Sequence, residues 1–374
     1  MKKIIYILLI PVILLYACTN DINQNTDGEV IKNKYAKGFE VSKIDEGFIL
    51  KVFNNLGSGE AITYNYLLSS KSDSESGNNE IIHIPVSKVV CLSTTHCAFI
   101  SQLDKSLSIK GISGLNYIYD DEIRELILNK HISEVGYDNQ TNIEEIISLN
   151  PDVVFAFGID NSGMSSYQKL SEIGIPVVYV GDFYETSPLG RTEWIKFFSC
   201  FYDNFDYACE YFDSVENNYI EIKDNIADKK TNEPEILLNL PWKGTWWVPG
   251  AKSYFANFIK DAGGIYKMVE GNENGSIPLT VEEVFANSQN ADIWLNPNQI
   301  TRKSEITDIE SRLIDFKALK NAKIFNNNRR VNMYGGNDFY ESGILHPDLI
   351  LKDLGIIFHE LGNPTELYYY QEIK

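Results

Sequence analysis

TNIEEIISLNPDVVF, at residues 141–155, has a second copy in TVEEVFANSQNADIWL, at residues 280–295. Each copy predicts a polar N-cap, a helix that begins with glutamates, a turn and a short apolar strand. Thr141 or Asn142 in the first copy and Thr280 in the second can cap backbone amides, and the glutamates complement the helix dipole. The apolar run is typical of a strand buried on both faces of a parallel sheet. Two such units predict two similar α/β lobes with a ligand cleft between them.

The chain begins with a secretion signal. Two lysines precede an apolar run over residues 4–15, which ends in LYAC at residues 15–18. The run is too short to span a bilayer. Its ending resembles a bacterial lipobox, which makes Cys18 a lipidated first residue; an ordinary signal peptide with a chance cysteine is the alternative. We therefore expect a signal peptide over 1–17, a lipid-anchored polar tether over 18–34, and a place in the envelope of a bacterium, facing the periplasm or the exterior.

Composition narrows the classes of partner. The net charge of −19 argues against nucleic acid and anionic membrane surfaces, because both bind basic patches. The alternative interpretation of this negative charge is that it only keeps the protein soluble. The four cysteines beyond Cys18 lack the paired spacing of a zinc site or a disulfide framework. Cys91 falls in an apolar strand, and a Cys200–Cys209 bridge requires a bend in the helix between them. No metal site and no cofactor is predicted.

Helical periodicity marks the middle of the chain. Between Arg191 and Lys230 there is neither Pro nor Gly, and apolar residues recur at gaps of three and four. Asp203-Asn204 is expected to interrupt this stretch and to leave a second helix of about 25 residues, close to 40 Å long. A helix of that length joins two lobes stiffly.

Earlier in the chain, residues 48–53 and 61–68 flank NNLGSG and predict a β-hairpin. Strands alternate with helices after residue 87, which predicts parallel sheets with crossover helices. The predicted segments beyond the tether are a β-rich segment (35–86), a first α/β lobe (87–203), a linking helix (204–230), a second α/β lobe (231–363) and a tail (364–374).

A set of short motifs in this order resembles the helical-backbone class (cluster A-II, or type III) of ABC-importer substrate-binding lipoproteins, over residues 86–358. The motifs are KVVCLSTTH (88–96), NIEEI with NPD (142–146 and 150–152), DAGG (261–264), EEV (282–284) and KALKNAKIF (317–325). The resemblance implies two Rossmann-like lobes with central parallel sheets, joined by a backbone helix, with the ligand between them. It implies capture of an iron complex, either a ferric siderophore or haem, with cobalamin as the alternative. The β-rich segment is not part of the family core, and we expect it only to cover a sheet edge.

The resemblance also implies a membrane partner. In this family one surface glutamate on each lobe meets arginines of the permease in the inner membrane, and the matching residues are Glu144 and Glu282. Two carboxylates far apart on a stiff frame fix orientation as well as attraction. The alternative is that both glutamates only begin helices.

Candidate ligand contacts come from the loops that follow the strands, because ligands of open α/β sheets bind beyond the carboxyl ends of the strands. Flat rings there suit a large, partly apolar chelate, and a cation such as Arg302 suits a ligand carboxylate. For any single ring, the alternative to ligand contact is packing in the core. Direct binding of iron by His96 or a tyrosine is a further alternative. The predicted ligand-binding residues are Thr94, Thr95, His96, Tyr117, Tyr119 and Asp160 in the first lobe, and Trp242, Trp246, Trp247, Arg302, Tyr334, Asn337 and Tyr340 in the second.

Two other functions remain open. Chelatases and some oxidoreductases use comparable paired lobes, but an enzyme needs a nucleophile–base pair, a phosphate loop or a closed set of metal ligands. The sequence has no Gly-rich phosphate loop, no Gly-x-Ser-x-Gly and no His-Glu-x-x-His. A surface adhesin would leave the aromatic loops unexplained. We therefore expect a binding protein and not an enzyme.

Overall fold

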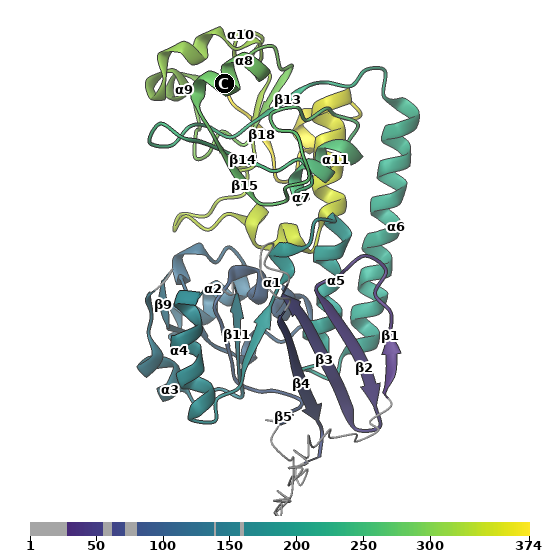
Figure 1. Cartoon of the computed structure of the whole chain (residues 1–374), viewed down its shortest axis with the longest axis vertical. Coiled ribbons are helices and arrows are strands. Elements are labelled where there is room, and N and C mark those ends of the chain that lie inside the picture. The colour runs from purple at the N-terminus through teal and green to yellow at the C-terminus, as the bar shows by residue number, and fades with distance from the viewer. Residues whose placement is uncertain (1–27, 55–61, 72–80, 138–139, 158–160) are drawn as a thin grey trace, which may run out of the picture.

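Two α/β lobes lie along the long axis of the molecule, and one long helix, α6 (Phe205–Lys229), runs beside both of them (Figure 1). The computed structural model describes residues 28–54, 62–71, 81–137, 140–157 and 161–374. Cys18, with the predicted signal peptide and most of the tether, lies outside these residues. Within them, no helix combines the length and the apolar character needed to cross a bilayer.

The first lobe is built on a parallel sheet with the strand order β12-β11-β6-β7-β8. Its central strands are mostly apolar and buried, apart from Lys110 in β7 and Phe157 at the end of β11, as expected where helices cover both faces. The strands are β6 (Val89–Cys91), β7 (Ile109–Ile112), β8 (Ser133–Glu134), β11 (Val153–Phe157) and β12 (Val177–Val180). The helices are α1 (Thr94–Gln102), α2 (Asp121–Leu128), α3 (Ile143–Leu149), α4 (Asn161–Glu172) and α5 (Pro188–Ser199), and a small ribbon pairs β9 (Gly136–Tyr137) with β10 (Gln140–Thr141).

The second lobe has the strand order β13-β16-β17-β18, in which the first three strands are parallel and β18 is antiparallel. These strands are β13 (Ile236–Leu238), β16 (Ile293–Leu295), β17 (Ile324–Asn326) and β18 (Gln371–Glu372), beside a ribbon of β14 (Trp246–Pro249) and β15 (Ser276–Leu279). The helices are α7 (Tyr254–Asp261), α8 (Val281–Ser288), α9 (Lys303–Ile309), α10 (Lys317–Lys320) and α11 (Pro347–His359). The predicted fold, paired α/β lobes with central parallel sheets, is confirmed.

The repeated sequence has the same role in both lobes. Asn142 caps α3 and Thr280 caps α8, the latter in a reciprocal capping box with Glu283. The aspartate after each helix then ties down the first strand of its lobe. Asp152 accepts the backbone N–H groups of residues 87 and 88 at 2.7 and 2.9 Å, and Asp292 accepts that of residue 235 at 2.9 Å. Each copy therefore fixes a helix and also the entry to the neighbouring strand.

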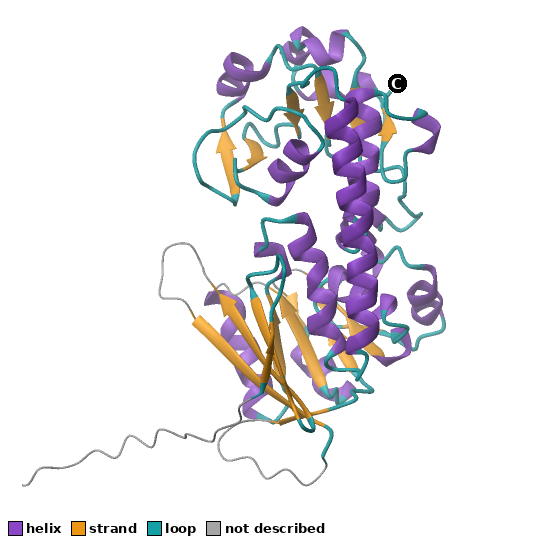
Figure 2. Cartoon of the chain, turned by 90° about the vertical axis from the view of Figure 1, so that its right-hand side faces the viewer, coloured by secondary structure: helices purple, strands orange, loops and turns teal. Residues whose placement is uncertain are grey.

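Helix α6 begins after the predicted interruption. Asp203 has the left-handed φ of 53°, which ends the helical run after α5. The 25-residue helix then packs its apolar stripe on α5 of the first lobe and on α11 of the second, and Figure 2 shows it spanning both. Cys200 and Cys209 are free thiols. The structure therefore has no bridge between them, although the chain does change direction at Asp203.

The N-terminal segment forms a five-stranded sheet that belongs to the first lobe. The predicted hairpin is confirmed by the antiparallel pair β3 (Gly47–Asn54) and β4 (Ile62–Ser69), although its turn lies outside the described residues. The other strands are β1 (Glu29–Ile31), β2 (Phe39–Ile44) and β5 (Ile81–His83). Strand β1 corrects the expectation that the polar tether extends to residue 34, because the chain is already paired with β2 there.

Buried carboxylates hold this sheet in place. Glu193 of α5 accepts the backbone N–H groups of residues 34–36, and Glu185 accepts those of residues 37 and 38. At the other side of the sheet the hydroxyl of Tyr66 accepts the N–H of Tyr179, on edge strand β12, at 2.9 Å. The segment thus covers the edge of the parallel sheet and also packs on α5.

The last residues are not a separate tail. Strand β18 completes the sheet of the second lobe, and Tyr369 and Tyr370 are fully buried. Asp353 of α11 accepts the N–H groups of residues 368, 369 and 370 at 2.7, 2.7 and 3.1 Å. Because one carboxylate accepts hydrogen bonds from three backbone N–H groups, it holds the C-terminal residues against α11. Burial raises the pKa of Asp353 to about 6.

Replacing Asp353 by Ala is expected to lower the free energy of unfolding by about 2 to 4 kcal/mol, because it leaves buried backbone N–H groups without a hydrogen-bond acceptor. Lys352→Ala, at the exposed neighbouring position of the same helix, is the matched control and should change stability by less than about 0.5 kcal/mol. Urea unfolding followed by circular dichroism measures both. Equal stability of the two variants would contradict this role for Asp353.

Candidate ligand site between the lobes

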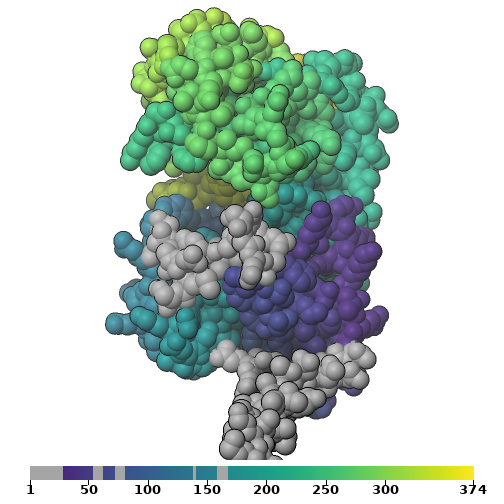
Figure 3. All heavy atoms as spheres, in the orientation of Figure 1, coloured from purple at the N-terminus to yellow at the C-terminus, as the bar shows by residue number. Residues whose placement is uncertain are grey.

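A cavity of about 830 Å³ lies between the two lobes. The space-filling view shows the surface hollowed there, between the blue first lobe and the green second lobe (Figure 3). Its lining comes from both lobes: Leu92, Ser93, Thr94, Ser113, Tyr117, Tyr137 and Phe157 from the first, and Asn298, Gln299, Thr301, Asn327, Asn328, Val331, Gly335, Asn337, Tyr340 and Gln371 from the second.

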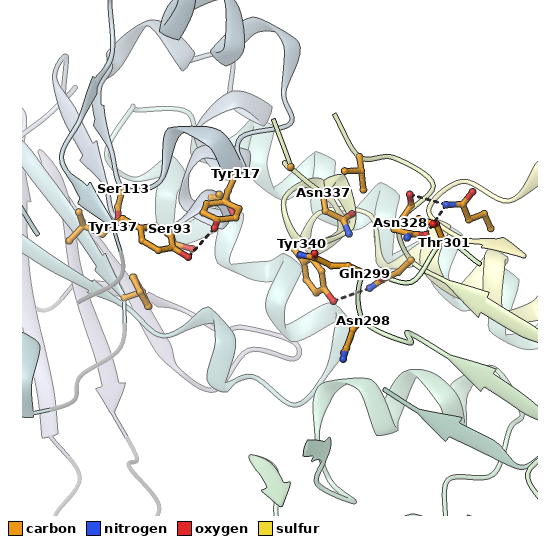
Figure 4. A pocket seen from close by; sticks show the side chains of 17 residues that line it. Ser93, Ser113, Tyr117, Tyr137, Asn298, Gln299, Thr301, Asn328, Asn337 and Tyr340 are labelled. Atoms are coloured by element: carbon orange, nitrogen blue, oxygen red, sulfur yellow. Dashed lines mark hydrogen bonds between the residues drawn. The ribbon is translucent and has the colours of Figure 1, made fainter. Parts of the chain in front are cut away.

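The first-lobe wall is built at the carboxyl ends of parallel strands. Ser93 follows β6 and caps α1, Ser113 follows β7, and Phe157 ends β11. Tyr117 and Tyr137 stack with ring centroids 5.4 Å apart, and their hydroxyls lie 2.9 Å apart (Figure 4). The wall therefore combines hydroxyl groups with flat aromatic surface.

The second-lobe wall is built mainly of amide side chains. Asn298 and Gln299 follow β16, and Asn298 has the left-handed φ of 53° that asparagine tolerates better than most residues. Asn327 and Asn328 follow β17, and Gln371 comes from the adjacent β18. Figure 4 shows Asn298, Gln299 and Asn328 across the cavity from the first-lobe side chains.

Hydrogen bonds within this wall orient several of its groups. Asn327 Nδ2 donates to the Tyr340 hydroxyl at 3.1 Å. Gln371 Nε2 donates to Asn328 Oδ1 at 2.7 Å, and Asn328 Nδ2 donates to the Ile300 carbonyl at 3.1 Å. Asn298 and Gln299 are exposed, and their side chains make no hydrogen bond to other described residues. They are available to a ligand.

A second cavity, of about 470 Å³, adjoins the first at Tyr340. Its lining includes Thr95, Ser253, Asn274 and the stacked pair of Arg191 and Tyr254, whose guanidinium carbon lies 3.8 Å from the ring centroid. Arg191 also donates to the backbone carbonyls of residues 183 and 185. This cation is therefore held against the first lobe.

One segment of the second lobe closes the cavities from behind. We call residues 330–346 the strap; it contains η5 (Asp338–Tyr340) and η6 (Ser342–Ile344) and supplies Asn337 and Tyr340 to the site. Its Glu341 is buried and accepts the N–H groups of Tyr119 and Asp120, in the first lobe, at 2.6 and 2.8 Å. Burial raises the pKa of Glu341 to about 8. Asn332 adds a bond to the Ile118 carbonyl at 2.7 Å.

The structure brings five of the predicted contacts together. Thr94, Tyr117, Asn337 and Tyr340 line the larger cavity, and Thr95 and Tyr340 line the smaller one. Asp160 lies outside the described residues.

Two predicted contacts are wrong because they are core residues. His96 is fully buried against the rings of Phe155 and Phe198, and burial lowers its pKa to about 3. Trp246 is fully buried, stacks on Trp294 and donates its indole N–H to the Leu238 carbonyl at 2.8 Å. Both side chains therefore pack in the core, which was the alternative interpretation for any single ring.

Five further predicted contacts line neither cavity. Most are held by an intramolecular partner: Tyr334 stacks under Arg124, Tyr119 faces Arg330, Trp242 faces Lys243, and Arg302 pairs with Glu305. Trp247 is half-exposed on β14. Charged side chains contact the first four groups; Lys243 and Glu305 are close in sequence to their partners, whereas Arg124 and Arg330 are distant from theirs.

Several lining residues were missed by the sequence analysis. Ser93, Phe157, Asn298, Gln299 and Thr301 lie in the predicted loops but were not singled out. Asn327 and Asn328 follow strand β17, so the same rule of strand ends applied to residues 324–326 would have found them. No sequence signal points to Gln371, because it reaches the site only through the antiparallel return of the chain.

The two repeated glutamates lie on separate lobes, on α3 and α8, toward opposite ends of the molecule (Figure 1). Glu144 is exposed and forms no ion pair with any described residue. Glu282 is also exposed but pairs with Arg312 at 2.9 Å, and this pair lowers the pKa of Glu282.

Comparison with known proteins decides the family. The model of the family described as "Periplasmic binding protein" matches residues 89–330. The chain belongs to this family. The resemblance to the helical-backbone class is thereby confirmed, because the match covers the first lobe from β6 onward, the helix between the lobes, and the second lobe as far as residue 330.

The similar proteins agree with this assignment. An uncharacterised lipoprotein of Methanocaldococcus jannaschii is 29% identical over 87% of this chain and 81% of its own length. A periplasmic haem-binding protein from Pseudomonas aeruginosa shares the fold with a TM-score of 0.59, at 15% identity, over 77% of this chain and 98% of its own. IsdE of S. aureus, complexed with haem, has a TM-score of 0.55 at 19% identity, over 73% and 98%.

Chemically, the arrangement is suited to reversible capture of a solute. Among the described residues, no cluster of three or more His, Cys, Asp or Glu is placed to hold a metal ion. What the cavity offers instead is a rim of hydrogen-bonding groups with aromatic faces between them.

The pH dependence of stability should report on Glu341. Its pKa is raised from about 4.5 to about 8 in the folded protein, so the folded state binds more protons than the unfolded state between these values. Glu341 should therefore make the free energy of unfolding fall as pH rises through this range, by at most about 1.4 kcal/mol per pH unit, in addition to the fall that Asp353 contributes below about pH 6. Urea unfolding from pH 5 to 8 measures this slope. In Glu341→Gln the slope should be shallower; an identical slope would contradict the assignment.

Proposed function

We propose that the protein is the substrate-binding lipoprotein of an ABC importer, and that it captures an iron complex between its lobes and delivers it to the permease. The observation that carries this proposal is the cavity of about 830 Å³ lined by both lobes. That volume is at the upper end of the range for small-molecule sites, about 300 to 1,000 Å³, and suits a metal chelate. The haem-binding proteins of the same fold support the ligand class, and cobalamin is the alternative.

The proposed location is the outer face of the membrane, with the lipid on Cys18. The sequence of residues 1–18 and the lipoprotein relative from M. jannaschii support it. The sheet begins at Glu29, so about ten polar residues separate the anchor from the folded body. A short tether of this kind would keep the body close to the permease.

For the permease contact we propose Glu144 and Glu282. Their positions on separate lobes joined by α6 suit a partner that contacts both glutamates at once. Arg312 is already paired with Glu282, so a permease arginine would have to compete with it or share the carboxylate. An exposed pair of this kind contributes little, typically below about 1 kcal/mol, so competition is feasible.

We do not propose an enzyme. The family and the proteins of the same fold are solute-binding proteins, which supports capture rather than turnover. The cavity lining consists of hydroxyls, amides and apolar groups, and the buried His96 is not available as a base.

Mixing the mature protein with haem, cobalamin and ferric siderophores should give one tight complex, seen by native mass spectrometry and visible absorption. Tyr340→Ala should weaken that complex about tenfold or more, because it removes a ring shared by both cavities. Trp242→Ala removes an equally exposed ring that lines neither cavity and should leave binding unchanged. If no chelate in the panel binds, the proposal fails.

Reversing both docking charges, in Glu144→Arg with Glu282→Arg, should abolish transport in cells that depend on this importer while ligand affinity stays within about twofold of the original. The matched control reverses one exposed glutamate per lobe elsewhere, Glu125→Arg with Glu270→Arg. Transport by the control should persist. Loss of ligand affinity in the first double variant, or equal loss of transport in both, would contradict the docking role.

A further inference from the structure

The two walls of the larger cavity differ in chemistry. Across from the serine, threonine and tyrosine hydroxyls of the first lobe, the second lobe presents carboxamide side chains (Figure 4). These amides are Asn298, Gln299, Asn327, Asn328, Asn337 and Gln371. Because they come from three strand ends and the strap, the fold gathers them on one wall although they are dispersed in the sequence.

A carboxamide is neutral and offers two N–H donors and one carbonyl acceptor. A wall of such groups therefore complements a ligand rim that also carries donors and acceptors in alternation, as amides and hydroxamates do. Asn298 and Gln299 are exposed to the cavity and unbonded to other described residues. Asn328 and Gln371 are instead fixed to each other at 2.7 Å, which holds part of the wall in one arrangement.

The first-lobe wall suits the apolar body of the same ligand. Tyr117, Tyr137 and Phe157, which line the cavity between the lobes, remain 46%, 56% and 42% exposed. Exposed rings in such a place are usually covered by a bound molecule. Phenol hydroxyls at the edge of the stacked tyrosine pair add neutral hydrogen-bonding groups.

No described Lys, Arg or His lines the larger cavity, and Arg191 of the adjoining cavity already donates to the backbone carbonyls of residues 183 and 185. Arg302 pairs with Glu305 at 2.9 Å, Arg330 with Asp338 at 2.5 Å, and Arg124 donates to the Leu115 carbonyl at 2.8 Å. The internal segments outside the described residues (55–61, 72–80, 138–139 and 158–160) contain no Lys, Arg or His in the sequence. A ligand carboxylate in the larger cavity would thus be desolvated against amides and hydroxyls, which compensate a full charge poorly.

We propose that the ligand is an electrically neutral metal chelate whose rim carries amide or hydroxamate groups, recognised by the amide wall of the second lobe. The inference rests on the proposed function and narrows its ligand class. A neutral ferric trihydroxamate and a corrinoid with carboxamide side chains share this chemistry. Haem, with its two propionates, and trianionic ferric catecholates do not.

The test is a competition among four probes measured by quenching of intrinsic tryptophan fluorescence: a neutral ferric trihydroxamate, cyanocobalamin, haem and a ferric tricatecholate. One of the first two should bind at least about tenfold more tightly than either of the last two. Which neutral probe wins separates the hydroxamate from the corrinoid. Tighter binding of haem or the tricatecholate overturns the inference and leaves the proposed function standing, whereas absence of all binding overturns both.

Two variants at one position test the wall itself. Gln299→Leu should weaken the neutral complex roughly tenfold, as expected for one lost hydrogen bond, and Gln299→Arg should improve the binding of haem. Gln168→Leu and Gln168→Arg, at an exposed position on α4 outside both cavities, are the matched controls. If Gln299→Leu and Asn337→Leu both bind the neutral probe as tightly as the original protein, recognition by the amide wall is overturned.

Discussion

The packing of α6 against both lobes is the constraint on which the site depends. Gly355 of α11 allows the helices to approach, since a Cβ there would lie 2.9 Å from Ile226 of α6. Polar contacts reinforce the packing: Tyr219 donates to Asp261 at 2.8 Å, and Lys223 pairs with the same carboxylate at 2.7 Å. Because one rigid helix is bonded to both lobes, their separation is set by helix geometry rather than by a flexible linker. The cavity is the space that this separation leaves.

The strap adds a second connection between the lobes, directly behind the cavity. Glu341 bonds two first-lobe amides, and two residues earlier in the same segment Phe339 packs its ring against Tyr369 and Tyr370 of the C-terminal residues. The buried C-terminal residues therefore support the wall that Gln371 joins. A single continuous structure links α11, β18, the strap and the first lobe, so that ligand contacts on both walls are held with little freedom to move apart.

Local sequence patterns were sufficient to predict the fold, and the reasons are visible in single residues. Thr280 with Glu283, and Asn142, mark helix starts because capping depends on neighbours within one turn. The predicted break at Asp203 has a left-handed backbone, another local property. The site was less accessible to such reasoning. His96 and Trp246 have the residue types of a binding loop, but whether they face a cavity or a core depends on Phe198 and Trp294, which are distant in sequence. Gln371 reaches the site by strand pairing alone.

The central claim is that the chelate binds between the tyrosine pair of the first lobe and the amide wall of the second. Anomalous scattering at the iron edge, from crystals grown with a neutral ferric trihydroxamate, or at the cobalt edge, from crystals grown with cyanocobalamin, tests it most directly. A single strong peak is predicted in the larger cavity, between Tyr117 and Tyr137 on one side and Asn298 and Gln299 on the other. A peak on the outer surface, or an empty cavity in crystals that contain the bound metal, would contradict it.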